Sequence, residues 1–555
     1  MKWPGLSTSG EHPPYEHAPK VAAQIMQSPH CNGRPFRNRQ ALIAGAPRNV
    51  AVGLELPHCS TSQPVISMGE SQTPIQGHFH AFYPRRPQNG TSRRQPALVS
   101  IVSWPRFDIA VAASIQAQMQ QLRPLRGMIV ARTKDVPSVK DMMQTDPQDG
   151  PTGSRDGARY PIRVGLLWHS VSSGNLGVGA LTLGNIALVR QVAAKLGLAP
   201  QFTVMSMRDG DAPALLEGEV DIFVIDSRAL LSPGGFWRAV AAVDCVLDIG
   251  AGDSFADIYG PKRFGFLWLT KMMAIARKVP LVLSPQTIGP FTGALYKMLA
   301  ANAMRRSTAV LARDQQSLDV TRQMAPSAPS RLSVDVAFVL PFDDRSNERG
   351  GAKIRVGVNA SGLLFHQAET GANRFGLDYD YARFTRGLLT QLCMRDDVEV
   401  HLVPHATSKA DPTDDDGRLA DRLIKEFPEA IRVPEFRGPS EAKSYISSLD
   451  FLVAGRMHAC IGAFSAGTPV VPVAYSRKFS GLFGLLGYDH VLPVKGIGEE
   501  AAVEFVLNGI DKRNELGAAA ANGMKKVDAL LDVYRAALED VFIQAARKRG
   551  FEPRA

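Results

Sequence analysis

Short apolar runs recur along the chain from about residue 160 onwards, and stretches with helical spacing of apolar positions separate them. Such a run, bounded by turn residues, is typical of a strand buried on both faces of a parallel sheet. Helical spacing is clear from Leu183 to Leu196, where Gly197 ends the helix, and again around Val527–Ala545. Strands that alternate with helices predict a doubly wound α/β fold. The predicted strands are Ile162–Trp168, Phe202–Met205, Asp221–Ile225, Cys245–Ile249, Leu281–Leu283, Ala309–Leu311, Ile354–Val358, Val398–Val403, Phe451–Ala454, Val470–Val473 and Val491–Val494.

The α/β pattern divides into two series at Asp343–Ala352, a polar stretch with two glycines that we expect to act as a hinge. We therefore predict one Rossmann-like domain over residues 160–342 and a second over residues 352–546. Residues 1–159 are rich in Pro, Gly and Arg, and we expect this segment to be mostly disordered because it cannot bury enough apolar area. Met128 is a plausible internal start. Two α/β domains joined by a hinge are expected to enclose a cleft suited to two substrates.

Composition narrows the function. The net charge is +10, but most of the basic surplus falls in the first 158 residues, so we expect no nucleic-acid partner. The five cysteines are scattered without a C-x-x-C pair, which fits a reducing compartment. We find neither a signal peptide nor an uncharged apolar stretch of the ~20 residues that span a bilayer. We expect a cytoplasmic protein with no bound metal, because no Cys or His set has the spacing of metal ligands.

Arg456 and His458 follow the predicted strand Phe451–Ala454, where the chain enters a helix that ends before Gly467. Ligands of open parallel sheets bind beyond the carboxyl ends of the strands, and helix N-termini there favour anions. Arg456 offers a fork for phosphate or carboxylate, and His458 can give or take a proton near neutral pH. Alternatively, Arg456 pairs with a surface carboxylate and His458 caps the helix. His405 follows another strand at the same edge and either lines the cleft or is a surface histidine.

The first domain carries glycine-containing loops at the same edge of its sheet. The loop after Ile162–Trp168, His169–Gly179, lacks the third glycine of a dinucleotide fingerprint. Asp253 ends a second loop and is a candidate either for contact with a hydroxyl or for capping the next helix. In the second domain, Asp411–Gly417 has the wrong spacing for a calcium loop, and we expect it to cap the helix Arg418–Phe427.

Five motifs in this order resemble the polysaccharide pyruvyl transferases over about Pro161–Val494. They are N-L-G at Asn175–Gly177, D-I-G-A-G-D at Asp248–Asp253, S-P-Q-T-I-G-P at Ser284–Pro290, A-R-D at Ala312–Asp314, and G-R-M-H at Gly455–His458 before A-G-T-P. The resemblance implies a glycosyltransferase-B-like pair of Rossmann-like domains. It also implies transfer of the enolpyruvyl unit of phosphoenolpyruvate to sugar hydroxyls, commonly as a pyruvate ketal.

The resemblance assigns the donor to Arg313, Arg456, His458 and Lys478, with His405 nearby. Met457 stands where the family usually has Leu, which leaves the two flanking positions intact. The acceptor is assigned to the first domain, where the candidates are Asn175, Gly177, Gly250, Gly252 and Gln286. Ala251 replaces the middle residue of the family's usual triple glycine, so the details of acceptor binding stay open.

The implied chemistry agrees with these residue types, because phosphoenolpyruvate carries a phosphate and a carboxylate that several cations can bind. His458 is the candidate acid for C3, and Asp253 is the candidate for taking a hydroxyl proton. No cofactor is needed beyond phosphoenolpyruvate as co-substrate. The acceptor is a polysaccharide or a lipid-linked oligosaccharide, through which the protein can make peripheral contact with the inner face of the membrane.

Two other functions remain open at this point. A sugar-nucleotide glycosyltransferase of the same fold would need an acidic residue for the ribose, and Glu435 or Glu441 could serve. A non-catalytic glycan-binding homologue would need neither a donor nor an acid.

Overall fold

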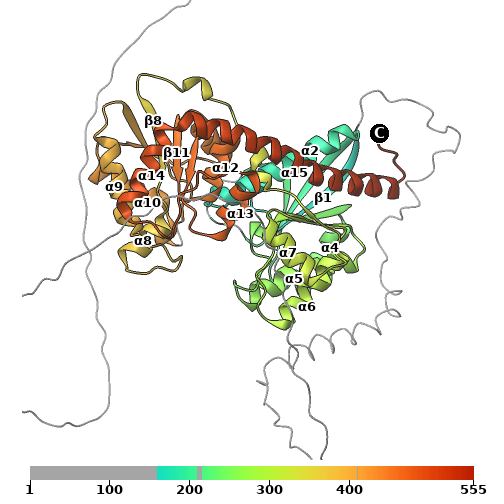
Figure 1. Cartoon of the computed structure of the whole chain (residues 1–555). Coiled ribbons are helices and arrows are strands. Elements are labelled where there is room, and N and C mark those ends of the chain that lie inside the picture. The colour runs from blue at the N-terminus through green and yellow to red at the C-terminus, as the bar shows by residue number, and fades with distance from the viewer. Residues whose placement is uncertain (1–158, 209, 211–214, 409–410, 555) are drawn as a thin grey trace, which may run out of the picture. The chain divides into compact units, whose positions relative to one another are not determined.

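The computed structural model describes residues 159–208, 210, 215–408 and 411–554 (Figure 1). The predictions for residues 1–158, including the disordered segment, lie outside these described residues. Both sheets belong to one compact unit, Thr145–Ala555.

The first sheet has seven parallel strands in the order β3-β2-β1-β4-β5-β6-β7. Its inner strands β1, β4, β5 and β6 are buried on both faces, because helices cover the sheet on either side. The strands are β1 (Tyr160–Leu167), β2 (Leu198–Ser206), β3 (Val220–Val224), β4 (Cys245–Asp248), β5 (Leu281–Gln286), β6 (Ala309–Ala312) and β7 (Ser330–Leu332). The helices are α2 (Leu176–Lys195), α3 (Ser227–Leu231), α4 (Phe236–Ala241), η3 (Gly250–Gly252), α5 (Pro261–Ala276), α6 (Ala294–Arg306), α7 (Gln315–Met324) and η4 (Val336–Val339).

The second sheet has five parallel strands in the order β10-β9-β8-β11-β12. Its strands are β8 (Ile354–Asn359), β9 (Val398–Leu402), β10 (Ile431–Arg432), β11 (Phe451–Ala454) and β12 (Val470–Pro472). The helices around it are η5 (Ser346–Glu348), α8 (Gly362–Glu369), α9 (Tyr381–Cys393), η6 (Pro412–Asp414), α10 (Asp416–Glu426), α11 (Pro439–Ser447), α12 (Met457–Ser465), α13 (Arg477–Leu486), α14 (Glu499–Asp511) and α15 (Arg513–Lys548).

The predicted fold class, two Rossmann-like α/β sheets, is confirmed. The predicted strand Val491–Val494 is wrong, since only Leu492 pairs there, in an isolated bridge to Val473. Pro493 follows at once and has no N–H to continue the pairing. The limits 160–342 and 352–546 stay predictions.

The last helix, α15, joins the two sheets (Figure 1). It packs against β12 and α12 of the second sheet and against α2, β1 and β4 of the first. Its Tyr534 is fully buried, and the hydroxyl contacts Asn185 of α2 at 2.8 Å and Ser284 of β5 at 2.9 Å. Because unpaired buried polar groups are costly, these bonds fix α15 on the first sheet.

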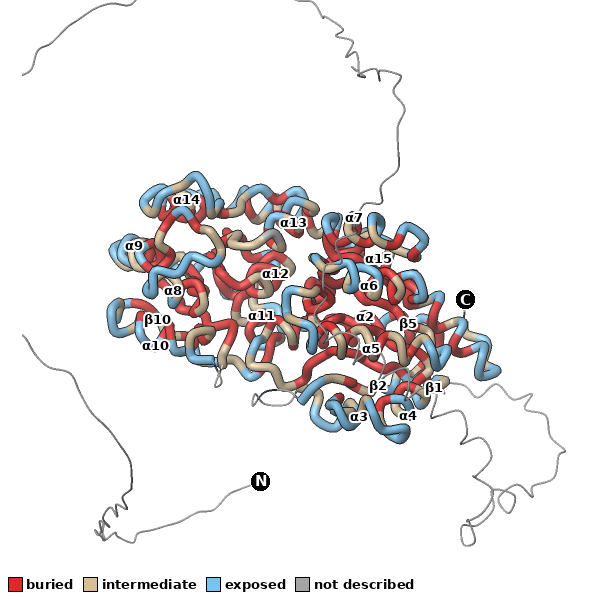
Figure 2. The backbone as a smooth tube through the Cα atoms, turned by 90° about the horizontal axis from the view of Figure 1, so that it is seen from below, coloured by how far each residue is buried: buried red, intermediate tan, exposed pale blue. Residues whose placement is uncertain are grey.

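Buried residues continue from one sheet to the other through α2 and α12, which pack together (Figure 2). Within the described residues, α2 is the one helix whose length and hydropathy fit a membrane span, and most of it lies buried in this core. Its N-terminus lies against the loop that follows β9. There the N–H of Leu176 donates to His405 at 3.3 Å, and the N–H of Thr407 donates to Gly174 at 3.0 Å.

Gly174 permits this approach, since a Cβ there would lie 2.3 Å from the carbonyl oxygen of Thr407. The loops that follow β1 and β9 thus meet, which brings candidate residues from both halves together.

Candidate active site

Arg456 lies between β11 and α12, in the N-cap position of the helix. Its Nε is 3.1 and 3.2 Å from the two carboxylate oxygens of Asp416, and its Nη2 is 2.7 Å from Asp416 and 2.5 Å from Asp414. Burial acts to lower the pKa of Arg456, but the carboxylates of Asp416 and Asp414 outweigh it and raise the pKa. The guanidinium is therefore permanently charged and already neutralised.

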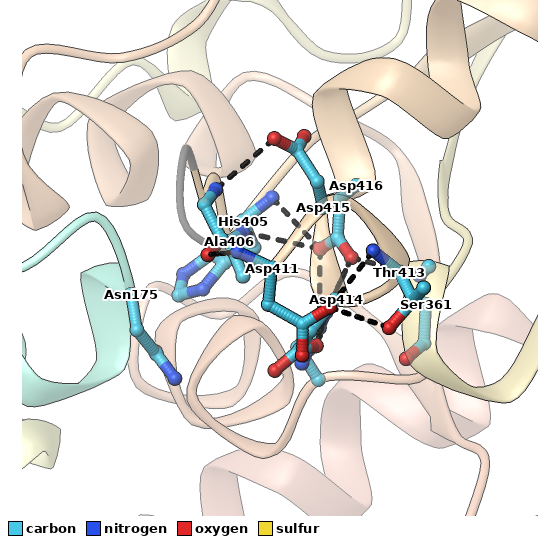
Figure 3. Close-up of polar contacts among 12 residues, drawn as sticks. Asn175, Ser361, His405, Ala406, Asp411, Thr413, Asp414, Asp415 and Asp416 are labelled. Carbon is cyan, nitrogen blue, oxygen red and sulfur yellow. Dashed lines mark hydrogen bonds and ion pairs between the residues drawn. The ribbon is translucent and has the colours of Figure 1, made fainter. Parts of the chain in front are cut away.

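Asp414 and Asp416 were missed in the sequence. The acidic run was correctly predicted to cap a helix, since Asp415 accepts a bond from the N–H of Arg418 at 3.0 Å. Its two neighbours turn instead toward Arg456, and Asp416 also accepts from the backbone N–H of His405 at 3.2 Å (Figure 3).

His405 is buried, so the alternative of a surface histidine is wrong. Burial first, and then the nearby His458, lower the pKa of His405 to about 3. Its ring is neutral at physiological pH and adds no positive charge to the site. Figure 3 shows it beside Asn175, whose backbone forms a bridge with Ala406.

His458 stands in the first turn of α12, with 18% of its side chain exposed. Its Nε2 is 3.7 Å from Oδ2 of Asp335 and has no hydrogen-bond partner among the described residues. Gly177 makes room for the ring, because a Cβ at Gly177 would lie 2.3 Å from Nδ1 of His458. The N-cap position belongs to Arg456, so a capping role for His458 is not what the structure shows.

The sequence analysis predicted that Gly177 lies in the loop His169–Gly179, but the structure places it in α2. Asn175 caps α2 by accepting from the N–H of Gly177 at 3.0 Å, so the helix already includes the glycines expected before it. The cap places the helix N-terminus beside His458.

Arg313 is buried after β6 and bridges two elements of the first half. Its Nη1 donates to Asp335 at 2.7 Å and its Nε donates to Thr287 at 2.9 Å. Asp335 is fully buried, which would raise its pKa, but Arg313 and then His458 lower the pKa to about 2. Asp335 was missed in the sequence because the short strand before it, β7, is not apolar enough to be recognised.

Asp253 and Lys478 form an ion pair between the two halves. Asp253 follows η3, and Lys478 comes from α13 of the second half. The hydroxyl of Tyr259 also donates to Asp253, at 2.8 Å. Burial acts to raise the pKa of Asp253, but Lys478 and Tyr259 outweigh it, and the pKa lies below its usual range. Asp253 does not cap the next helix, because α5 begins only at Pro261.

The loop before Asp253 has left-handed backbone at three successive residues, with φ of 54° at Gly250, 49° at Ala251 and 87° at Gly252. Gln286 lies wholly buried beneath it and donates to the carbonyl of Asp248 at 2.7 Å. Its side chain supports the loop and has no exposed atom with which to reach an acceptor in this conformation. Acceptor contacts of Asn175, Gly177, Gly250, Gly252 and Gln286 stay predictions.

A cavity of about 370 Å³ opens beside Asp253 at the carboxyl ends of β1, β2 and β4. Serine hydroxyls, one indole ring and two arginines line it, which suits a ligand rich in hydroxyl groups. The lining residues include Trp168, Ser170, Ser173, Arg208, Asp253, Ser254 and Arg263.

Charge interactions link these groups one to the next across the site. Arg313 contributes to the low pKa of Asp253 and pairs with Asp335, which faces His458. His458 in turn acts on His405, near the pair of Arg456 and Asp416. Between residues 159 and 554, as far as the structure describes them, no three His, Cys, Asp or Glu side chains are grouped to hold a metal ion. Glu435 and Glu441 line a separate cavity of about 700 Å³.

The fold is therefore of the α/β class, with two Rossmann-like sheets that present cations, carboxylates and an imidazole near the carboxyl ends of their strands, where ligands of parallel sheets bind. The model of the polysaccharide pyruvyl transferase family matches residues 183–477. The chain belongs to this family.

Among solved structures, the chain is similar to HepE of Anabaena, determined with UDP and glucose, at 13% identity and a TM-score of 0.43. That match covers 68% of this chain and 99% of HepE. The chain is also similar to the α,α-trehalose 6-phosphate synthase of Burkholderia multivorans, at 12% identity and a TM-score of 0.39, over 72% of this chain and 99% of that one. At such scores these likenesses carry no argument about the reaction. No curated protein matches the chain.

Proposed function

We propose that this protein transfers the pyruvyl unit of phosphoenolpyruvate to sugar hydroxyls of a polysaccharide or lipid-linked glycan and forms a pyruvate ketal. Family membership supports a pyruvyl transferase. The observation that carries the proposal is the arrangement around His458, whose Nε2 has no hydrogen-bond partner among the described residues. Each of the three predicted donor cations, Arg313, Lys478 and Arg456, is paired with a carboxylate, and the partner of Arg313, Asp335, also faces His458.

The donor is a strong anion with two charged groups. Its phosphate and carboxylate can compete with the protein carboxylates for the same cations. Until the donor binds, the carboxylates neutralise the buried Arg313 and Arg456, which would be costly to leave unpaired. Lys478 is the most accessible of the three, with 32% of its side chain exposed, and we assign it the first contact with the donor.

His458 then gives the proton on Nε2 to C3 of the donor, and C2 becomes electrophilic. A sugar hydroxyl adds to C2 and loses its proton, for which Asp253 is the candidate acceptor once Lys478 has turned to the donor. The C2–O bond to phosphate breaks, and a second hydroxyl adds to C2 and loses its proton to His458, which thereby regains the proton that it gave to C3. The products are the ketal and inorganic phosphate. The cavity beside Asp253 is the candidate site for the sugar.

Calorimetric titration of the protein with phosphoenolpyruvate and, separately, with UDP-glucose tests the donor. We expect saturable binding of phosphoenolpyruvate, and phosphate release when a glycan acceptor is added. Binding of UDP-glucose without binding of phosphoenolpyruvate would reject the proposal in favour of a glycosyltransferase. The reaction is proposed to take place in the cytoplasm, at the inner face of the membrane where the acceptor is lipid-linked.

A further inference from the structure

Asp335 is placed between the two halves of the proposed donor site. Its Oδ2 is 2.7 Å from Nη1 of Arg313, on the first sheet, and 3.7 Å from Nε2 of His458, on the second. Its Oδ1 accepts from the N–H of Ala337 at 2.9 Å and caps η4, which packs against both α2 and α12. One carboxylate thus has fixed geometry with respect to both functional side chains.

The carboxylate has no access to water. A buried charge of this kind is tolerated only when it is paired and hydrogen-bonded, and Arg313 supplies the short contact. The pKa of about 2 means that Asp335 is ionised at any pH near neutrality. It therefore holds a negative charge near His458 throughout the physiological range.

Neither Arg313 nor His405 supplies a negative charge to His458. Arg313, after β6, is a cation, and His405, after β9, is buried and neutral. The N-terminus of α12 itself carries partial positive charge, which disfavours a protonated ring in its first turn. From α2, Gly177 faces the ring, since a Cβ there would lie 2.3 Å from Nδ1 of His458.

We propose that Asp335 is a positioning residue for the transfer reaction, whose carboxylate aims Arg313 at the donor and places a fixed negative charge beside Nε2 of His458, the candidate acid. The inference rests on the proposed function for the identity of the donor. The 3.7 Å separation is longer than a hydrogen bond, so the proton on Nε2 stays available for transfer.

Nitrogen NMR of the histidine rings across a pH series tests the electrostatic part without an acceptor, with His458→Gln to assign the signal. An opposite charge at this distance shifts a titration by about 1–3 pH units. We therefore expect the midpoint of His458 to fall by about that amount in Asp335→Asn. An unchanged midpoint in folded Asp335→Asn would overturn the proposal.

Asp244→Asn is the matched control. Asp244 pairs with Arg163 and Arg549 just before β4, at the opposite edge of the same sheet, and its loss should leave the midpoint of His458 unchanged. If Asp335→Asn does not fold, Asp335→Glu decides. The retained charge should keep the midpoint within about half a pH unit, far less than the shift above. The displaced Arg313 should weaken phosphoenolpyruvate binding about tenfold. Unchanged binding would overturn the positioning role.

Binding of phosphoenolpyruvate to the wild-type protein is measured separately. Its absence would reject the proposed function, while the titration of His458 would still decide the role of Asp335.

Discussion

Arg456 and Lys478 were both predicted to bind the donor, and the structure places them in different surroundings. Arg456 has 11% of its side chain exposed and contacts two carboxylates of its own half, whereas Lys478 has 32% exposed and pairs with Asp253 across the two halves. A buried, multiply bonded pair is hard to exchange, while a partly exposed single pair can give way to an incoming anion. The family resemblance assigned both cations to the donor, but they differ in how freely they can move to a ligand.

The largest expected effect comes from breaking the buried pair. In Arg456→Ala, Asp416 keeps a buried charge without its main partner, and we expect the free energy of unfolding to fall by about 3–5 kcal/mol. Urea denaturation measures this loss. In Arg163→Ala, a control at a half-exposed pair, the loss should stay below about 1 kcal/mol. Equal losses in the two variants would remove the distinction between the pairs.

Replacing His458 separates catalysis from the two ion pairs, because its side chain belongs neither to the pair of Arg456 and Asp416 nor to that of Lys478 and Asp253. In His458→Gln we expect turnover to fall by about 10²–10⁴-fold, the usual contribution of a positioned acid. Unfolding and binding of phosphoenolpyruvate should change little, as measured by urea denaturation and calorimetry. His490→Gln, which replaces a histidine packed on Tyr488, should leave turnover unchanged. Full activity in His458→Gln would exclude it as the acid.

Lys478→Met tests the exchangeable pair. Loss of a charged contact with the donor should weaken binding of phosphoenolpyruvate by about 10–100-fold. Stability should change by less than about 1 kcal/mol. Lys195→Met is the control, since Lys195 is paired with Glu539 at the far end of α2. Calorimetry on both variants gives the answer, and equal donor affinity in the two would contradict the first contact assigned to Lys478.

The smallest effect is a dependence of stability on pH. Asp253 has a lowered pKa in the folded protein, because Lys478 and Tyr259 outweigh its burial. Its contribution is therefore complete above the ordinary carboxyl pKa of about 3.9 and is lost as pH falls through the lower, folded value. At pH 6 we expect the free energy of unfolding of the wild type to be higher than that of Asp253→Asn by less than about 1 kcal/mol. Urea denaturation should show this difference shrinking as the pH falls below about 3.9, and a difference that grew there would contradict the lowered pKa of Asp253.

The sheets were predictable because parallel strands covered on both faces must be apolar along their whole length. Phe451–Ala454 is found with the predicted limits. The missed strands β7 and β10 are short and partly exposed, with an arginine in each, so no apolar run marks them. The run Val491–Val494 shows the opposite error. It is apolar and was predicted as a strand, but Pro493 has no N–H with which to continue the pairing.

Arg456 was predictable from its position after a strand, where ligands of parallel sheets bind, whereas Arg313 and Lys478 were assigned by the family resemblance. Their carboxylate partners were not predictable. Asp335 caps η4 and Asp416 begins α10, both far along the chain from His458 and Arg456, and no local spacing links them. Gly177 was noticed, but its reason, the space it leaves for an imidazole from the other half, depends on contacts between distant segments.

Residues that follow the last helix, α15, cover one flank of the first strand, β1. The ring of Phe551 stacks on Tyr160 at 4.4 Å, and Arg549 bonds to the carbonyl of Pro161 at 3.0 Å. The contact of Arg549 joins residues 388 positions apart, so during synthesis this flank of β1 stays uncovered until Arg549 and Phe551 have been made. Deletion of Arg549 and Phe551 would therefore leave this flank of the first sheet exposed.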